Sequence, residues 1–187
     1  MITTDTSVRE QIVSTADRLF YKQGYNLTGI NQIIEEAGVA KASLYYHFHS
    51  KEDLCVAYLK RRGEKWSAML AKYIEGVSDP KEAIIKCFEC RSKYLQQNGF
   101  SGCSYIRIIA EMPQRSAKIN KQAVLNKEKQ REFFAEQVSK LKKVPGNSVK
   151  DFANTIFLLF DGATVQCQVY RELSPIENAL KALKILL

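Results

Sequence analysis

The chain has 187 residues, of which 45% are hydrophobic and 26% are charged, as in a globular protein with a buried core. It contains no run of about 18 apolar residues, and its N-terminus lacks the basic and then apolar pattern of a secretory signal. Its five cysteines are odd in number and irregularly spaced, which disfavours a disulfide framework. We therefore expect a cytoplasmic protein that does not contact the membrane.

The formal net charge is +8, but the charge is unevenly distributed. Residues 1–50 hold four Lys and Arg against five Asp and Glu, whereas residues 101–150 hold eleven against four. The total charge alone therefore does not indicate that the chain binds DNA. A basic run on the helix expected over 116–143 is most often a solvated face, although an acidic ligand or a secondary nucleic-acid contact is an alternative.

Apolar residues recur at helical spacing along the chain, and no strand-type alternation stands out, so we expect an all-α fold. The first helix is predicted to start at a capping box, Ser7-x-x-Glu10, and to end at Gly24. Thr28 is predicted to cap a short second helix that ends at Gly38, where glycine enters the left-handed region without strain. A third short helix is expected over 40–48.

A second capping pair, Ser50-x-x-Asp53, predicts a long helix that extends to about Gly76. Later helices are expected over roughly 81–97, 103–112, 116–143, 148–171 and 175–186. This organisation predicts an N-terminal three-helix domain over 1–52, with a helix-turn-helix at about 29–48. A larger helical domain for ligand binding and dimerisation is expected over 53–187.

The two short helices around Gly38 describe a helix-turn-helix, whose second helix can enter a DNA major groove. Apolar residues such as Ile33, Leu44 and Phe48 are expected to bury its small core. The side chains left to face outward are Lys41, Ala42, Ser43, Tyr45, Tyr46 and His47. The alternative is that the aromatic residues here are ordinary core residues of a helical hairpin.

The segments 37–39, 43–48 and 50–54 (Ala-Gly-Val, Ser-Leu-Tyr-Tyr-His-Phe and Ser-Lys-Glu-Asp-Leu) resemble the signature of the TetR family of bacterial transcriptional regulators. In that family the N-terminal domain binds operator DNA as a dimer. The resemblance implies that the DNA-binding residues are Thr28, Lys41, Ala42, Ser43, Tyr45, Tyr46, His47 and Lys51. Among them, Lys41, Ala42 and Ser43 would contact bases, while Thr28 and Lys51 would hold phosphates. Ala40 departs from the family, which often has a Ser or Thr cap there.

The same resemblance implies that the body binds a small-molecule effector and dimerises through its last two helices, over 148–171 and 175–186. An apolar stripe in the last helix favours dimerisation, although packing within one chain could also bury it; it comprises Ile176, Ala179, Leu180, Leu183 and Leu186. Because ligand sites are often aromatic, the pocket candidates are Trp66, Phe88, Phe100, Tyr105, Phe134, Phe157 and Tyr170.

Gly-Phe-Ser-Gly-Cys over 99–103, with Ala110-Glu111 and residues 174–180, resembles the NemR-like branch of the family. Those repressors respond to electrophiles or oxidants through a cysteine, and Cys103 is the matching position. The alternative is that Cys103 is a small buried hydrophobe. Cys87-x-x-Cys90 would need two further ligands to bind a metal, and both histidines lie in the N-terminal domain. We expect no metal and no cofactor.

These observations predict a homodimeric repressor that binds a palindromic operator and is released by a small ligand or by cysteine modification. No Gly-x-Ser-x-Gly, His-Glu-x-x-His or P-loop motif occurs in the chain, which disfavours an enzyme. The alternative function is that of a helical adaptor or small-molecule-binding protein without specific DNA binding.

Overall fold

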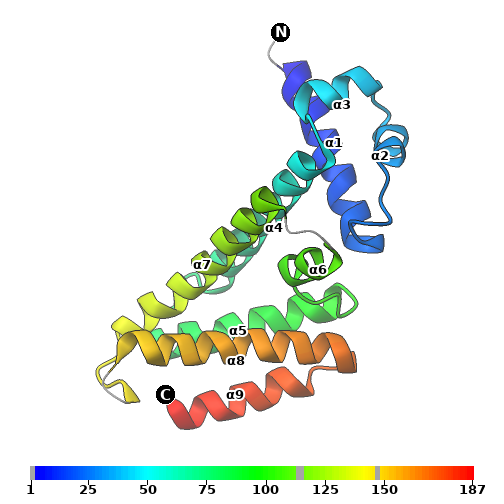
Figure 1. Ribbon diagram of the computed structural model, residues 1–187. Coiled ribbons are helices and arrows are strands. Elements are labelled where there is room, and N and C mark those ends of the chain that lie inside the picture. The colour runs from blue at the N-terminus through cyan, green and yellow to red at the C-terminus, as the bar shows by residue number, and fades with distance from the viewer. Residues whose placement is uncertain (1–2, 113–115, 146–147) are drawn as a thin grey trace. The chain divides into compact units, whose positions relative to one another are not determined.

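The computed structural model describes residues 3–112, 116–145 and 148–187, and within these ranges it contains helices and no strand (Figure 1). The predicted all-α fold is confirmed. The helices are α1 (Thr3–Gln23), α2 (Ile30–Ala37), α3 (Lys41–His47), α4 (Lys51–Tyr73), α5 (Pro80–Gln97), α6 (Ser104–Glu111), α7 (Ala117–Ser139), α8 (Val149–Tyr170) and α9 (Ser174–Leu186). No described helix is long and apolar enough to cross a membrane.

The chain forms two compact units, and the first comprises residues 1–64 and 104–126. This unit holds α1, α2, α3 and α6 together with the first parts of α4 and α7. Its core is built from the apolar faces of these helices and includes Ile12, Phe20, Ile33, Leu44 and Tyr58. The boundary expected after residue 52 falls inside α4, and the first unit continues to Glu64.

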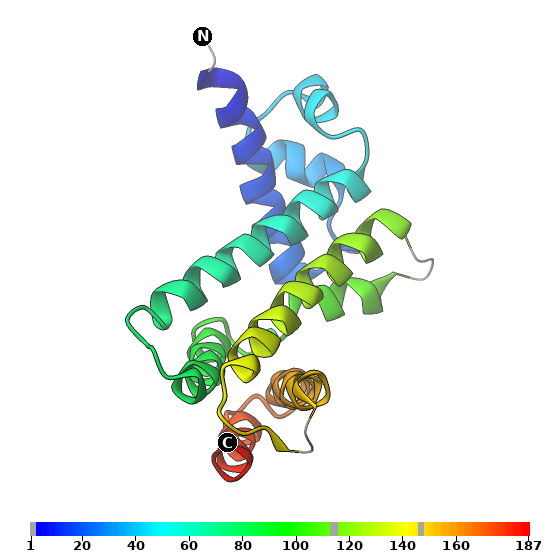
Figure 2. The same ribbon diagram turned by 90° about the vertical axis from the view of Figure 1, so that its left-hand side faces the viewer.

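The second unit comprises residues 65–103 and 127–187 and is organised around α5, α8 and α9. The helices α8 and α9 pack along each other, and α5 contacts both; Figure 2 shows the three nearly end-on. Phe88 on α5, Phe134 on α7 and Phe160 on α8 form the centre of the core, with ring centroids 5.2–6.1 Å apart. This unit therefore has a strongly aromatic interior.

Some predicted helix starts are confirmed and others are wrong. The Ser50 hydroxyl accepts a hydrogen bond from Asp53 N at 3.1 Å, as the capping pair predicts. The capping box at Ser7 is wrong, because α1 already begins at Thr3 and Ser7 lies within the helix. The cap predicted at Thr28 is also wrong, because Gly29 is the N-cap residue of α2 and makes no side-chain cap.

The apolar stripe of α9 is largely buried within its own unit. Ile176, Ala179 and Leu183 are at most 4% exposed, and Leu180 packs against the same core. Packing within one chain therefore accounts for most of this stripe. Its last member, Leu186, is 39% exposed, and so does not share that burial.

Candidate nucleic-acid interface and effector site

Helix α3, the second helix of the predicted helix-turn-helix, has one buried face and one exposed face. Leu44 is fully buried, and Phe48, the C-cap residue of α3, is 4% exposed. By contrast, Tyr45 is 42% exposed and Tyr46 is 73% exposed. On the exposed side the helix also presents Lys41 and Ala42, with Ser43 and His47 partly buried. The predicted outward set therefore shares one surface, and the alternative that Tyr45 and Tyr46 are core aromatics is wrong.

The turn between α2 and α3 depends on one glycine. Gly38 adopts a left-handed conformation (φ 63°), and its N–H donates to Glu35 O at 3.1 Å. A β-carbon at this position would meet no atom within 4 Å, so the demand for glycine comes from the backbone and not from crowding. The predicted end of the second helix at Gly38 is confirmed.

The N-terminus of α3 has no side-chain cap, because Ala40 occupies the N-cap position in an extended conformation (ψ 145°). We expect Ala40→Ser to raise the free energy of unfolding by about 1 kcal/mol, since a hydroxyl there can accept a hydrogen bond from a first-turn N–H group. Chemical denaturation measures the change, with Ala42→Ser inside the same helix as the control. Equal stability of Ala40→Ser and the wild type would contradict the expectation.

Thr28 does not lie where a phosphate contact requires it. Its side chain is fully buried, and its hydroxyl donates to Gly24 O at 2.6 Å. This bond closes the loop between α1 and α2, so Thr28 has a structural role in the loop. The Thr28 side chain is therefore not one of the proposed DNA contacts.

Lys51, at the first position of α4, is partly buried against an aromatic ring. Its Nζ lies 4.2 Å from the Tyr25 ring centroid. Burial lowers the pKa of the Lys51 ammonium, and burial also raises the pKa of the Tyr25 hydroxyl to about 12. Lys51 thus borders the α1–α2 loop, and a phosphate contact requires its ammonium to leave the ring or to extend past it.

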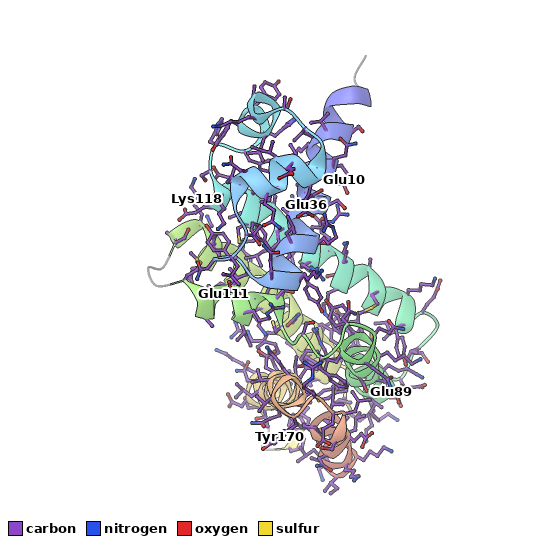
Figure 3. The ribbon with its side chains drawn as sticks, turned by 90° about the vertical axis from the view of Figure 1, so that its right-hand side faces the viewer. Glu10, Glu36, Glu89, Glu111, Lys118 and Tyr170 are labelled. Carbon is purple, nitrogen blue, oxygen red and sulfur yellow. The ribbon has the colours of Figure 1, made fainter. Side chains whose placement is uncertain are left out.

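Hydrogen bonds from α6 hold the loop that leads into α2. The Glu111 carboxylate accepts hydrogen bonds from Tyr25 N at 2.6 Å and from Asn26 N at 3.1 Å, and the Asn26 side-chain amide donates to Glu111 O. One turn earlier in α6, the Arg107 guanidinium donates to Tyr21 O at 3.0 Å. Figure 3 labels Glu111 at the end of α6. These contacts join residues 85 or 86 positions apart, and the sequence reasoning missed them.

Gly24 also belongs to the contact between α6 and the α1–α2 loop. It has a φ of 92°, and a β-carbon built on it would lie 2.7 Å from both carboxylate oxygens of Glu111. Any larger residue therefore has both a strained backbone and a collision with the carboxylate. The glycine that ends α1 is thus also the position that lets Glu111 approach the loop.

A second polar contact holds the start of α4. Lys118 Nζ, from α7, donates to Asp53 Oδ1 at 2.8 Å (Figure 3 labels Lys118). This hydrogen bond, together with one from Ser50, lowers the pKa of the Asp53 carboxyl. Lys118 belongs to the basic run that the sequence assigns to a solvated face, and its ammonium is paired within the first unit.

The predicted effector residues divide into three groups. Trp66, Phe88 and Phe134 are buried in the aromatic core of the second unit, and Phe100 and Phe157 pack against that core. Tyr105 is buried in the first unit and is not a member of this core. Tyr170, at the end of α8, is 64% exposed, and its place in a pocket is wrong for that reason (Figure 3).

All five cysteines are free and buried. Cys103 directly precedes α6 and is 5% exposed, so its thiol is little accessible in this conformation. Burial raises the pKa of Cys87 above the usual thiol range, and burial also raises the pKa of Cys90. Across the described ranges, no group of three or more His, Cys, Asp or Glu residues is placed to hold a metal ion.

A two-helix unit with an exposed basic and aromatic second helix has the arrangement of a helix-turn-helix. The sequence profile of the bacterial regulatory proteins of the tetR family matches residues 12–58. The HTH-type transcriptional regulator LmrA of Bacillus subtilis is 47% identical over 77 residues, which are 41% of this chain and 41% of LmrA. The chain thus spans about two fifths of the length of that relative.

A second relative matches along nearly the whole chain. The HTH-type transcriptional repressor NemR of Escherichia coli is 25% identical over 97% of this chain and 94% of NemR. The crystal structure of reduced E. coli NemR superposes with a TM-score of 0.83, covering 96% of both chains at 22% identity. Residues 12–58 therefore resemble the tetR-family regulatory proteins, and along nearly its whole length the chain is similar to NemR in sequence and in fold.

Proposed function

We propose that the chain is a homodimeric repressor that reads a palindromic operator with α3 of each subunit. The observation that carries this proposal is the exposure of α3: Tyr46 is 73% exposed, although Leu44 on the same helix is fully buried. Lys41 adds a cation and Ser43 a hydroxyl to the same helix. Such side chains can contact phosphates and base edges in a major groove.

An apolar stripe on α8 supports dimerisation through the last two helices. Leu158 is 70% and Val169 68% exposed, and Gly162 lies between them on the same helical face. A β-carbon on Gly162 would meet nothing within 4 Å, so a partner helix can approach closely there. We infer that α8 and α9 of two subunits form a four-helix bundle.

Selection from a pool of random duplexes tests the proposal and identifies the operator sequence in the same experiment. We expect a two-fold symmetric consensus whose half-sites lie about 34–36 Å apart, because a symmetric dimer reads two major grooves on one face of DNA. Sedimentation should give the mass of a dimer. A monomer, or selected duplexes without a shared sequence, would contradict the proposal.

Repression ends when few dimers remain in the conformation whose two α3 helices fit the operator. A small effector achieves this if it binds more tightly to a conformation with a different spacing of the two α3 helices. The relative NemR is a transcriptional repressor, which supports the sign of regulation. Modification of Cys103 is the second proposed route to release.

We expect Cys103→Ser to abolish release of operator DNA by N-ethylmaleimide or hypochlorite. The buried thiol must become exposed by local opening before it reacts, so release should be slow and should follow thiol modification in time. Fluorescence anisotropy of labelled operator measures release, and Cys55→Ser is the matched control. Full release of the Cys103→Ser variant would show that another site responds.

A further inference from the structure

One cation is enclosed within the aromatic core of the second unit. Arg91, on α5, is 5% exposed, and its guanidinium carbon lies 3.7 Å from the Trp66 ring centroid. The Phe160 ring lies 5.0 Å and the Tyr94 ring 5.5 Å from the same carbon. Tyr94 is only partly buried, so among the three rings around Arg91 it is the one nearest to solvent.

The charge of Arg91 is not balanced by a carboxylate in the described part of this unit. Its Nε is buried and has no hydrogen-bond partner. Glu89, on the same helix, and Asp161, which follows Phe160 in the sequence, each pair with a lysine. The neighbouring thiols Cys87 and Cys90 stay neutral, because burial raises the pKa of each. Cation–π contacts recover only part of the cost of burying a guanidinium, so an anion is the missing partner.

A second buried polar group lies in the same unit. Gln130, on α7, is 6% exposed, and its Oε1 has no hydrogen-bond partner among the described residues. It precedes Phe134 by four residues and so shares a helical face with it. The Phe134 ring lies 5.4 Å from Phe160, which also contacts Arg91. A few convergent polar groups in an apolar lining are typical of small-molecule sites.

We propose that Arg91 binds the carboxylate of a small monocarboxylic acid whose apolar or aromatic body packs against Trp66 and Phe160. One guanidinium matches one carboxylate in charge and can hold it with two parallel hydrogen bonds. Gln130 Oε1 is an acceptor, so it can bond only to a donor group on the body of the acid and not to its carboxylate. The inference rests on the proposed function, since it names the chemical class of that regulator's effector.

Matched acids and amides test the charge requirement in the wild-type protein without DNA. The probes are benzoate, phenylacetate and octanoate, each compared with its amide by calorimetry. We expect at least one acid to bind, and its amide to bind at least about tenfold more weakly, because the amide lacks the charge-assisted hydrogen bonds. Absence of binding by all three acids, or equal affinity for acid and amide, overturns the inference.

Variants then assign the effect to Arg91. Arg91→Met should lose acid binding by at least about tenfold, Arg91→Lys should keep part of it, and Lys129→Gln, an exposed change on α7, should leave it unchanged. Undiminished binding by a folded Arg91→Met variant overturns the inference. If that variant fails to fold, the comparison of acids with amides decides. Because no DNA is present, failure here is separate from failure of operator binding.

Discussion

The double variant Lys41→Ala, Tyr46→Ala is expected to lose specific operator binding by at least about a hundredfold while remaining a folded dimer. Both side chains lie on the exposed face of α3, so their removal leaves the buried face intact. Each direct contact to DNA contributes about 1–3 kcal/mol, and a dimer loses every contact twice. Fluorescence anisotropy with the selected operator at fixed salt measures the loss.

The matched control is Lys60→Ala, which removes an exposed lysine from α4 in the same unit. It should change operator affinity only slightly, because Lys60 does not belong to α3. Circular dichroism and sedimentation should show the same helix content and dimer mass for all variants. Wild-type operator affinity of the double variant would contradict the assignment of α3 as the recognition helix.

The all-α fold and the helix-turn-helix could be predicted because their signals are local. Helical spacing of apolar residues, the left-handed glycine at Gly38 and the Ser50–Asp53 cap each depend on residues a few positions apart. A local signal can also mislead, as it does at the start of α1. Ser7 matches a capping box, yet α1 starts one turn earlier.

The polar contacts that organise each unit could not be predicted, because their partners are distant in sequence. Glu111 and Asn26 are 85 residues apart, and Lys118 lies 65 residues from Asp53. Arg91 is one of several basic residues in the sequence, and its burial becomes evident only when Trp66 and Phe160 surround it. No residue pattern distinguishes it from a surface arginine.

Aromatic residues illustrate the same limit within one helix. Phe157 and Tyr170 both lie on α8, which is apolar over most of its length. Phe157 packs against the core, but Tyr170 is the last residue of the helix and is 64% exposed. Because apolar residues occupy more than one face of α8, periodicity alone does not identify the buried side.

Glu111→Ala is expected to destabilise the first unit by about 2–3 kcal/mol and to weaken operator binding about tenfold. The variant leaves Tyr25 N, which is partly buried, and Asn26 N without their charged acceptor. The loop that leads into α2 then loses its attachment to α6, so α2 and α3 sample orientations that do not fit the operator. Chemical denaturation and anisotropy measure the two effects.

Two comparisons separate the lost acceptor from a general loss of charge. Glu111→Gln keeps one acceptor oxygen and should lose less stability than Glu111→Ala. Glu64→Ala removes an exposed carboxylate from the same unit and should be nearly neutral. Equal losses for Glu111→Ala and Glu64→Ala would contradict a role for the Glu111 contacts.

A double-mutant cycle of Gly24 and Glu111 directly tests whether the Glu111 carboxylate packs against Gly24. Gly24→Ala should be strongly destabilising in the wild type, because its β-carbon would lie 2.7 Å from the Glu111 carboxylate oxygens and the backbone has a φ of 92°. In the Glu111→Ala background the collision is gone and only the backbone strain of about 1–2 kcal/mol remains. The cost of Gly24→Ala should therefore fall when Glu111 is absent. Additive effects would show that the carboxylate does not rest against Gly24 in solution.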